Sequence, residues 1–469
     1  MMQIPQLMSE QYREAKKIIQ SSEDIKVYSH IDCDGICSGA ILSTILDRLN
    51  KNHEIEFVNL DVLDNIDLDH DLTIFSDLGS GQLIDTNAKK SQKIIILDHH
   101  PPLRDLDYKN GKDYTYLEIN PIHHGIDGSY YVCGGGLCYF LSKEFGYDDL
   151  SWIGVLSAIG DMQNTHSGHF EGLNKIIQQD AIDGGYLEVI ENDINIYGRN
   201  TRPLFVALSY FNDVKLPITN NTSETMAILE ELGIDEKNNR KTLNELTMED
   251  KGKLYQKLSG MIAKEVPGNY VKYISQLIIG DSYTFLQESK DSFLRDASEF
   301  STAMNACGRN HEEKIAMEVL KGDRVAALDE LEVVNRDHRH NLAQSIEQVA
   351  EDADSNIVEL ENLQYFDGTG IKPEIVGTIT GMILGYCNWK KPIIGFTQTD
   401  DGGIKVSLRC SRLLSYDGIH FGNIIRNIAS KVGGSGGGHS MACGAYIPFD
   451  KKSEFIKQFN NSLEGKLTK

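Results

Sequence analysis

The stretch IIILDHH, residues 94–100, decides the fold class, because it joins a short β-branched run to a cluster of polar side chains. The run Ile94–Leu97 is typical of a strand buried on both faces, as strands of a parallel sheet are. Asp98–His100 follow it directly, and a Pro-Pro pair then stops any extension of the strand. Open α/β sheets bind their ligands beyond the carboxyl ends of the strands, so this cluster marks a candidate site.

The first 160 residues repeat this alternation of short apolar runs and helical stretches. Helices are expected over 36–50, 136–145 and 151–159. The pattern predicts an α/β domain with a parallel sheet. The predicted strands are Ile25–Ser29, Ile55–Leu60, Leu72–Ser76 and Ile94–Leu97.

Three further segments place carboxylates or imidazoles where a strand or a buried helix ends. They are HIDCDG at residues 30–35, Asp77 in FSDLG and Asp161 in SAIGD. Mn²⁺ and Mg²⁺ prefer carboxylate oxygens, and Mn²⁺ also accepts imidazole. Without bound cations, so many acids in one crevice would repel one another. A single Asp after a strand is as often a helix cap, so the metal hypothesis rests on the four segments taken together.

Composition narrows the class of protein. The 469 residues suggest about three domains, and 40% hydrophobic with 25% charged residues is ordinary for a globular chain. No apolar run approaches the ~18–20 residues that span a bilayer, and the start lacks an export signal. The eight cysteines form no CxxC pair. We therefore expect a soluble cytoplasmic protein with reduced thiols and no membrane partner.

Charged residues are distributed unevenly along the chain. The net charge is −23, yet residues 371–469 hold 13 Lys and Arg against 7 Asp and Glu. We expect an α/β domain over 1–210, an acidic helical module over 211–350 and a second α/β domain over 351–469. The middle module is either a protein-docking surface or a solvated helical spacer.

A glycine run, GGSGGGH at residues 433–439, precedes the strand-like MACGAYI. Glycines let backbone N–H groups approach a phosphate closely, although flexible linkers look alike. The flanking strand and the terminal His439 favour an ordered phosphate cradle.

Taken in order, HIDCDG, SDLG, LDHH and AIGD resemble the four motifs of the DHH phosphoesterase superfamily. GGSGGGHSMACGA resembles the glycine-rich signature of its DHHA1 partner domain. GRNTRPL, with Arg202 and Pro203, and NACGR at 305–309 resemble the archaeal RecJ-like branch, which includes a nuclease that associates with the GINS replication complex.

The resemblance implies two divalent cations, Mn²⁺ or Mg²⁺, with Asp77 bridging them. It implies that Asp98 orients His99 and that His100 faces the scissile phosphate. One ion would be held by Asp34, Asp77, His99 and Asp161, and the other by Asp32, Asp77 and His30.

The resemblance also implies a substrate-binding set in the C-terminal domain. Arg412 and Lys431 would add basic surface around it. The set that would hold the substrate's backbone or terminal nucleotide is Arg409, Gly436, Gly437, Gly438 and His439.

The activity implied is single-strand exonuclease hydrolysis of DNA, 5′→3′ and extending to RNA, in DNA replication or repair with GINS as a partner. One alternative is a small-substrate phosphodiesterase acting on oligoribonucleotides, cyclic dinucleotides or adenosine bisphosphate; such relatives are usually shorter. The other is a catalytically silent replisome scaffold that binds GINS, which the filled ligand positions disfavour.

Overall fold

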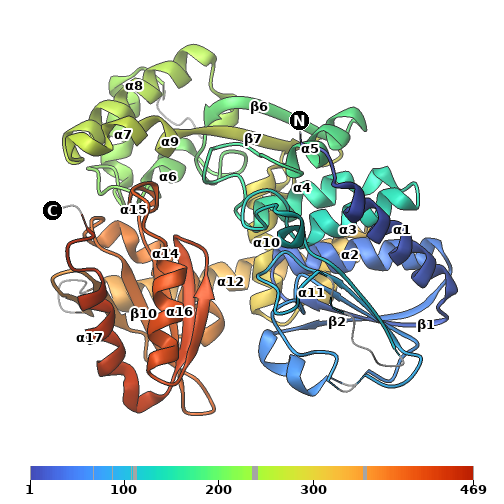
Figure 1. The fold of residues 1–469 in the computed structure, drawn as a ribbon. Coiled ribbons are helices and arrows are strands. Elements are labelled where there is room, and N and C mark those ends of the chain that lie inside the picture. The colour runs from blue at the N-terminus through green and yellow to red at the C-terminus, as the bar shows by residue number, and fades with distance from the viewer. Residues whose placement is uncertain are drawn as a thin grey trace. The chain divides into compact units, whose positions relative to one another are not determined.

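In the computed structural model, the β-branched runs near the N-terminus form a five-stranded parallel sheet in the order β2-β1-β3-β4-β5 (Figure 1). The four predicted strands are confirmed within a few residues. The fifth was not predicted from the sequence. The strands are β1 (Asp24–His30), β2 (Asn52–Val58), β3 (Leu72–Ser76), β4 (Lys93–Leu97) and β5 (Thr115–Ile119).

The structure describes residues 2–66, 68–86, 88–106, 108, 114–234, 241–351 and 356–467. The chain forms two compact units. Unit 1 contains Met1–Asp193 and Gly280–Arg336, and unit 2 contains Ile194–Ile279 and Asp337–Lys469. No helix in these ranges is long and apolar enough to cross a membrane.

Helices cover one face of the parallel sheet, where alternate strand residues such as Val27 and Ile74 enter a large apolar core. The strand residues that alternate with these, such as Tyr28 and Phe75, face a smaller apolar core on the other side of the sheet. This division follows from the alternation of side chains along a strand. The helices near the sheet are α1 (Gln6–Ser21), α2 (Cys33–Arg48), α3 (Gly134–Glu144), α4 (Ser151–Gly160) and α5 (Asn174–Asp183).

Parallel register brings the ends of three strands to one edge. Ser29 pairs with Ser76, and Ser76 pairs with Leu97. The residues that follow these positions, His30, Asp77 and the Asp98 cluster, therefore start from neighbouring points of the sheet. This arrangement builds the predicted polar crevice.

A later part of the chain returns to unit 1. It contributes β7 (Ile279–Phe285), which pairs with β6 (Leu187–Ile194), and α10 (Ala297–Arg309) and α11 (Glu313–Leu320). Helix α10 packs against α4 and α2. The predicted module over 211–350 is therefore divided between the units. Helices α10 and α11 carry an apolar face that is buried in the core of unit 1.

Gly308 shows how closely α10 meets the first metal motif. A Cβ at this position would lie 1.8 Å from the carbonyl oxygen of Ile31, so only glycine permits the approach. The backbone N–H of Cys33 also donates to the Asn305 side chain at 3.0 Å. The NACGR segment thus supports the loop between His30 and Asp34.

Unit 2 combines a helical part with a mixed six-stranded sheet in the order β12-β13-β11-β10-β9-β8. Helix α12 (Ala326–Ala350) begins in unit 1 and ends in unit 2. The strands are β8 (Ile357–Glu359), β9 (Gln364–Asp367), β10 (Ile393–Gln398), β11 (Ile404–Arg409), β12 (Ser435–Gly438) and β13 (Ala442–Ile447). The helices are α6 (Leu204–Ser209), α7 (Thr222–Glu231), α8 (Met248–Glu265), α9 (Ile274–Ile278), α14 (Pro373–Ile383), α15 (Arg412–Tyr416), α16 (Phe421–Lys431) and α17 (Lys452–Ser462).

An ion pair joins the helical part of unit 2 to its sheet part. Arg412 donates from Nε and Nη2 to Asp213 Oδ2 at 2.9 and 2.6 Å, and its backbone N–H donates to Asp213 Oδ1. Arg412 Nη2 also donates to the carbonyl of Leu277. The expectation that Arg412 adds basic surface is therefore wrong, because its charge is used within the fold. Trp389 and Leu413 extend the same contact into the helical core.

We predict that Asp213→Ala lowers the free energy of unfolding by about 2–4 kcal/mol, because it leaves the half-buried guanidinium of Arg412 without its carboxylate. Urea denaturation followed by circular dichroism measures the change. Glu249→Ala is the control, since it removes an exposed partner of Lys253 and should cost under ~0.5 kcal/mol. Equal stability of Asp213→Ala and wild type would contradict the structural role of this pair.

Candidate metal centre

The structure brings together all six side chains that the sequence nominated as metal ligands. They form overlapping groups whose ligand atoms lie within 4.8 Å of one another. His100 joins one group through Asp77 and His99. The groups are His30, Asp32 and Asp77; Asp34, His99 and Asp161; and Asp77, His99 and His100.

His99 lies at the middle of this cluster. Its Nε2 is 3.2 Å from Asp77 Oδ1, 3.5 Å from Asp34 Oδ2 and 3.8 Å from Asp161 Oδ2. Neither His99 Nε2 nor Asp77 Oδ1 makes a hydrogen bond within the described part of the chain, although both atoms are buried. Buried polar atoms rarely stay unpaired, so these lone pairs fit a bound cation.

Asp77 follows β3 with φ 60°, in the left-handed region that non-glycine residues avoid. Its backbone N–H donates to the Leu97 carbonyl at 2.9 Å. A Cβ on Gly134 would lie 2.6 Å from the Cβ of Asp77, so glycine is required where α3 begins. Strained backbone of this kind is typical of functional sites, and here it turns the carboxylate into the crevice.

Asp34 is held by the first residues of α3. The backbone N–H groups of Gly134 and Gly135 donate to Asp34 Oδ2 and Oδ1 at 2.8 and 2.7 Å, and the Ser157 hydroxyl donates to Oδ1. A Cβ on Gly135 would lie 2.1 Å from Ser157 Oγ. Helix N-termini stabilise anions, which explains how a buried carboxylate is tolerated here. Sequence reasoning missed this anchor, although three consecutive glycines at 134–136 marked it.

The crowding of acids changes the protonation of the site. Burial raises the pKa of Asp34, and the neighbouring charges of Asp77 and Asp161 raise it further. Burial by itself would lower the pKa of His99, but Asp161, Asp77 and Asp34 outweigh this effect and raise it well above its ordinary value. A metal ion that binds this cluster therefore competes with protons.

Asp98 binds His100, not His99. Asp98 Oδ1 accepts from His100 Nδ1 at 2.8 Å and from its backbone N–H, and Oδ2 accepts from the Ser80 N–H at 2.9 Å. His99 Nδ1 instead donates to the carbonyl of Gly128 at 2.7 Å. The expectation that Asp98 orients His99 is wrong, because side chains of successive residues in an extended segment point to opposite sides.

A further polar network supports the Asp98 segment. The Ser80 hydroxyl donates to Glu118 Oε1 at 2.6 Å, and Asn120 Nδ2 donates to Ser80 Oγ and to the His100 carbonyl. Ser80, Glu118 and Asn120 are all buried. They come from the loop after β3 and from β5 and its end, and sequence reasoning did not single them out.

The predicted substrate-binding residues lie in unit 2. Gly436–Gly438 belong to β12, an edge strand of the six-stranded sheet, and pair with β13. His439 follows, and its backbone N–H donates to the Ala442 carbonyl at 3.0 Å. The glycine run is thus an ordered strand, not a flexible linker. It leaves one backbone edge outside the β-ladder.

Arg409 ends β11 of the same sheet and packs against α14, where its Nη2 lies 3.0 Å from the Cβ position of Gly377. Burial lowers the pKa of its guanidinium. Among the described residues, no carboxylate forms an ion pair with Arg409. A desolvated cation of this kind favours an anionic ligand.

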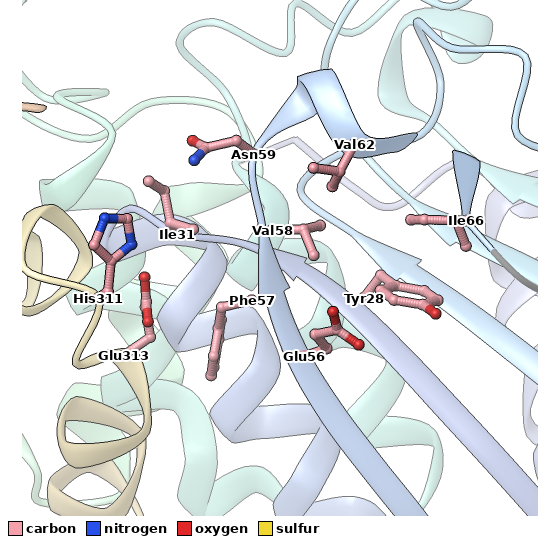
Figure 2. A pocket seen from close by; sticks show the side chains of 10 residues that line it. All are labelled: Tyr28, Ile31, Glu56, Phe57, Val58, Asn59, Val62, Ile66, His311 and Glu313. Carbon is pink, nitrogen blue, oxygen red and sulfur yellow. The ribbon is translucent and has the colours of Figure 1, made fainter. Parts of the chain in front are cut away.

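Figure 2 shows a pocket of about 660 Å³ at the carboxyl edge of the parallel sheet. It adjoins the first metal motif through Ile31, and Val58 in its wall pairs with His30 in the sheet. Glu56 and Glu313 line it, and none of the ten residues shown is Lys or Arg. None of the six candidate metal ligands lines this pocket, so it is distinct from the metal centre.

We predict that Gly134→Ala weakens Mn²⁺ binding by at least ~10-fold, because the added methyl group displaces Asp77 and the N–H that holds Asp34. Isothermal titration calorimetry measures the affinity. Gly260→Ala is the control, since Gly260 lies in α8 with no atom within 4 Å of its Cβ position. Wild-type affinity in a folded Gly134→Ala variant would refute the close-packing argument.

Mn²⁺ binding should also depend on pH. The pKa values of Asp34 and His99 are both raised, so a proton competes with the ion at each group more strongly than the ordinary pKa would imply. The apparent Kd should therefore tighten as pH rises from about 5.5 to 8, by at most about tenfold per pH unit for each displaced proton. Titration calorimetry at fixed ionic strength measures this slope, and a flat Kd over the range would contradict it.

Comparisons with known proteins agree with this geometry. Three family models match: the DHH family, N-terminal domain over residues 24–154, the DHH-CID domain over 196–278 and the DHHA1 domain over 360–465. The uncharacterized protein MJ0831 of Methanocaldococcus jannaschii is 31% identical over 98% of this chain and 100% of its own length.

Solved structures share the fold at low identity. RecJ from Thermus thermophilus in complex with Mn²⁺ is 14% identical with a TM-score of 0.58, covering 99% of this chain and 55% of RecJ. CDC45 from Entamoeba histolytica is 14% identical with a TM-score of 0.60, covering 98% of this chain and 99% of CDC45. The chain spans about half the length of that RecJ. With DHH, DHH-CID and DHHA1 domains in this order, the chain belongs to the DHH/DHHA1 superfamily.

Proposed function

We propose that the protein is a metal-dependent exonuclease that hydrolyses phosphodiester bonds of single-stranded DNA, 5′→3′, and also accepts RNA. The observation that carries this proposal is that His99 Nε2 and Asp77 Oδ1 lie buried 3.2 Å apart, neither with a hydrogen-bond partner among the described residues, and that the carboxylates of Asp34 and Asp161 surround them. A cluster of this composition suits hard divalent cations and has no other evident use.

Two cations, Mn²⁺ or Mg²⁺, would be shared through Asp77. When bound, such ions activate a water molecule and neutralise charge on phosphate oxygens. The residues that would hold them are Asp34, Asp77, His99 and Asp161 at one position and His30, Asp32 and Asp77 at the other.

His100 is the group that we assign to the scissile phosphate. Its side chain is 48% exposed, whereas that of Asp98 is 1% exposed. Burial would raise the pKa of Asp98, but the adjacent His100 outweighs this and lowers it, so Asp98 stays ionised. The carboxylate holds Nδ1–H of His100 and leaves the other edge of the ring available to a substrate oxygen.

Unit 2 supplies features suited to a nucleic-acid backbone. Its C-terminal hundred residues are basic, Arg409 is a partly buried cation, and β12 presents glycine backbone at a sheet edge. Phosphate and sugar contacts of this type position a strand without reading its sequence. A role in DNA replication or repair, with GINS docking on residues 211–350, completes the proposal and rests on the motif resemblance.

The test is digestion of end-labelled single-stranded DNA, single-stranded RNA and duplex DNA with Mn²⁺. Wild type should release mononucleotides from single strands. Asp77→Ala should lose roughly 10³-fold in rate, about 4 kcal/mol of transition-state stabilisation. Asp183→Asn, an exposed substitution at the end of α5, should match wild type.

The outcomes separate the alternatives. Early release of a 5′ label as mononucleotide supports 5′→3′ polarity. Cleavage restricted to dinucleotides would identify a small-substrate phosphodiesterase. Equal absence of hydrolysis in wild type and Asp77→Ala would favour the scaffold.

A further inference from the structure

The amide of Gln163 lies directly behind two of the candidate metal ligands. Its Nε2 donates to Asp161 Oδ2 and to the carbonyl oxygen of Gly128, both at 2.8 Å. The same carbonyl accepts from His99 Nδ1 at 2.7 Å. Gln163 is only 2% exposed, so its side chain serves the interior of the site. One buried amide therefore connects Asp161 to His99 through a single carbonyl oxygen.

Chemistry fixes the orientation of this amide. An ionised carboxylate and a peptide carbonyl only accept hydrogen bonds, so the atom that faces both Asp161 and Gly128 must be the NH₂ group. On the other side, Asn174 Nδ2 donates to Gln163 Oε1 at 2.5 Å. Asn174 is 1% exposed, and its backbone N–H donates to the Tyr131 carbonyl at 2.9 Å. Asn174 thus holds the amide in the one orientation that supports both acceptors.

The same carbonyl selects the tautomer of His99. Because the oxygen of Gly128 accepts, His99 Nδ1 carries the proton when the ring is neutral, and Nε2 carries the lone pair. Nε2 is the atom that faces Asp77, Asp34 and Asp161. A metal-ligating imidazole needs its lone pair on this side.

The end of helix α4 places Asp161 and Gln163 together. The N–H of Met162 donates to the carbonyl of Ile159, and the N–H of Gln163 donates to that of Ala158, both at 3.0 Å. Met162 has φ 58°, so the helix ends in a Schellman turn with methionine where glycine is usual. This turn folds the chain back after Asp161 and brings the two side chains within hydrogen-bonding distance.

We propose that Gln163 is a positioning residue for one of the two metal positions, the one formed by Asp34, His99 and Asp161. It holds the Asp161 carboxylate directly and the His99 ring through Gly128. The proposal rests on the proposed two-cation function.

The other metal position provides an internal reference. It is formed by His30, Asp32 and Asp77. Among the described residues, the side chain of Gln163 makes no hydrogen bond to this group. Loss of Gln163 should therefore affect the two ions unequally.

The experiment is a Mn²⁺ titration of the full chain by calorimetry, with electron paramagnetic resonance to count free ion. Gln163→Met keeps the length of the side chain and removes its donors. One ion should bind about 10–100-fold more weakly and the other with wild-type affinity. Gln179→Met is the matched control, because Gln179 is exposed on α5 and its side chain hydrogen-bonds only to Asp183 within the described part of the chain.

A second variant tests the orientation of the amide. In Asn174→Asp the carboxylate cannot donate to Gln163 Oε1, so the amide turns its NH₂ towards residue 174 and presents its oxygen to Asp161 and Gly128. This variant should reproduce the loss of one ion seen with Gln163→Met. If Gln163→Met does not unfold cooperatively in urea, the Mn²⁺ affinity of Asn174→Asp tests the positioning role in its place.

The results distinguish this inference from the proposed function. Wild type that binds no Mn²⁺ would overturn both. Wild type with two ions, and folded Gln163→Met and Asn174→Asp with two ions at wild-type affinity, would overturn the positioning role alone. Selective weakening of one ion in either variant, with Gln179→Met unchanged, supports it.

Discussion

Repulsion among buried carboxylates is the constraint on which the rest of the structure depends. Asp34, Asp77 and Asp161 all lie within 4 Å of His99 Nε2. Three carboxylates gathered around one imidazole cannot all remain ionised without compensation. The chain supplies part of it through the N-terminus of α3, whose N–H groups bind both oxygens of Asp34. Bound cations would supply the remainder, and this is the physical reason for expecting them.

Close backbone approach is the second requirement of the site. Gly134 and Gly135 leave no room for a Cβ beside Asp77 and Ser157. A Cβ added at Gly128 would lie 2.1 Å from the carbonyl oxygen of His99, so the loop that contains Gly128 also packs closely against the His99 backbone. Protein interiors are close-packed, and these contacts convert loop segments into a rigid frame. The strained backbone of Asp77 persists because this frame holds it on several sides.

Unit 2 is organised by a different principle. Its helical part is joined to its sheet part by shared apolar packing and by the Arg412–Asp213 pair. Tyr270 and Tyr273 add hydrogen bonds to α15 and the residue after it. The helical segment is therefore no free spacer. Any partner that docks on it would act on the body that also carries Arg409 and the glycine strand.

Local sequence by itself determined four of the five strands of the parallel sheet and the polar clusters that follow three of them, because β-branched runs and the polar residues that end them are neighbours in the chain. The set of six candidate ligands came from the resemblance of the four motifs to a known superfamily. Strand β5 escaped prediction, since TYLEI lacks a sustained β-branched run and its burial depends on α1.

Only the tertiary structure decided which groups support those ligands. Asp34 is anchored by residues about 100 positions away, and His99 by a carbonyl 29 positions away. Likewise, α10 belongs to unit 1 because its apolar face is buried against α4. The charge of this segment and its helical periodicity do not indicate which part of the chain it packs against. The local motifs identify which residues are candidate ligands. The orientation of those ligands depends on hydrogen bonds between segments that are far apart in the chain, and the spacing of residues along the chain does not reveal such bonds.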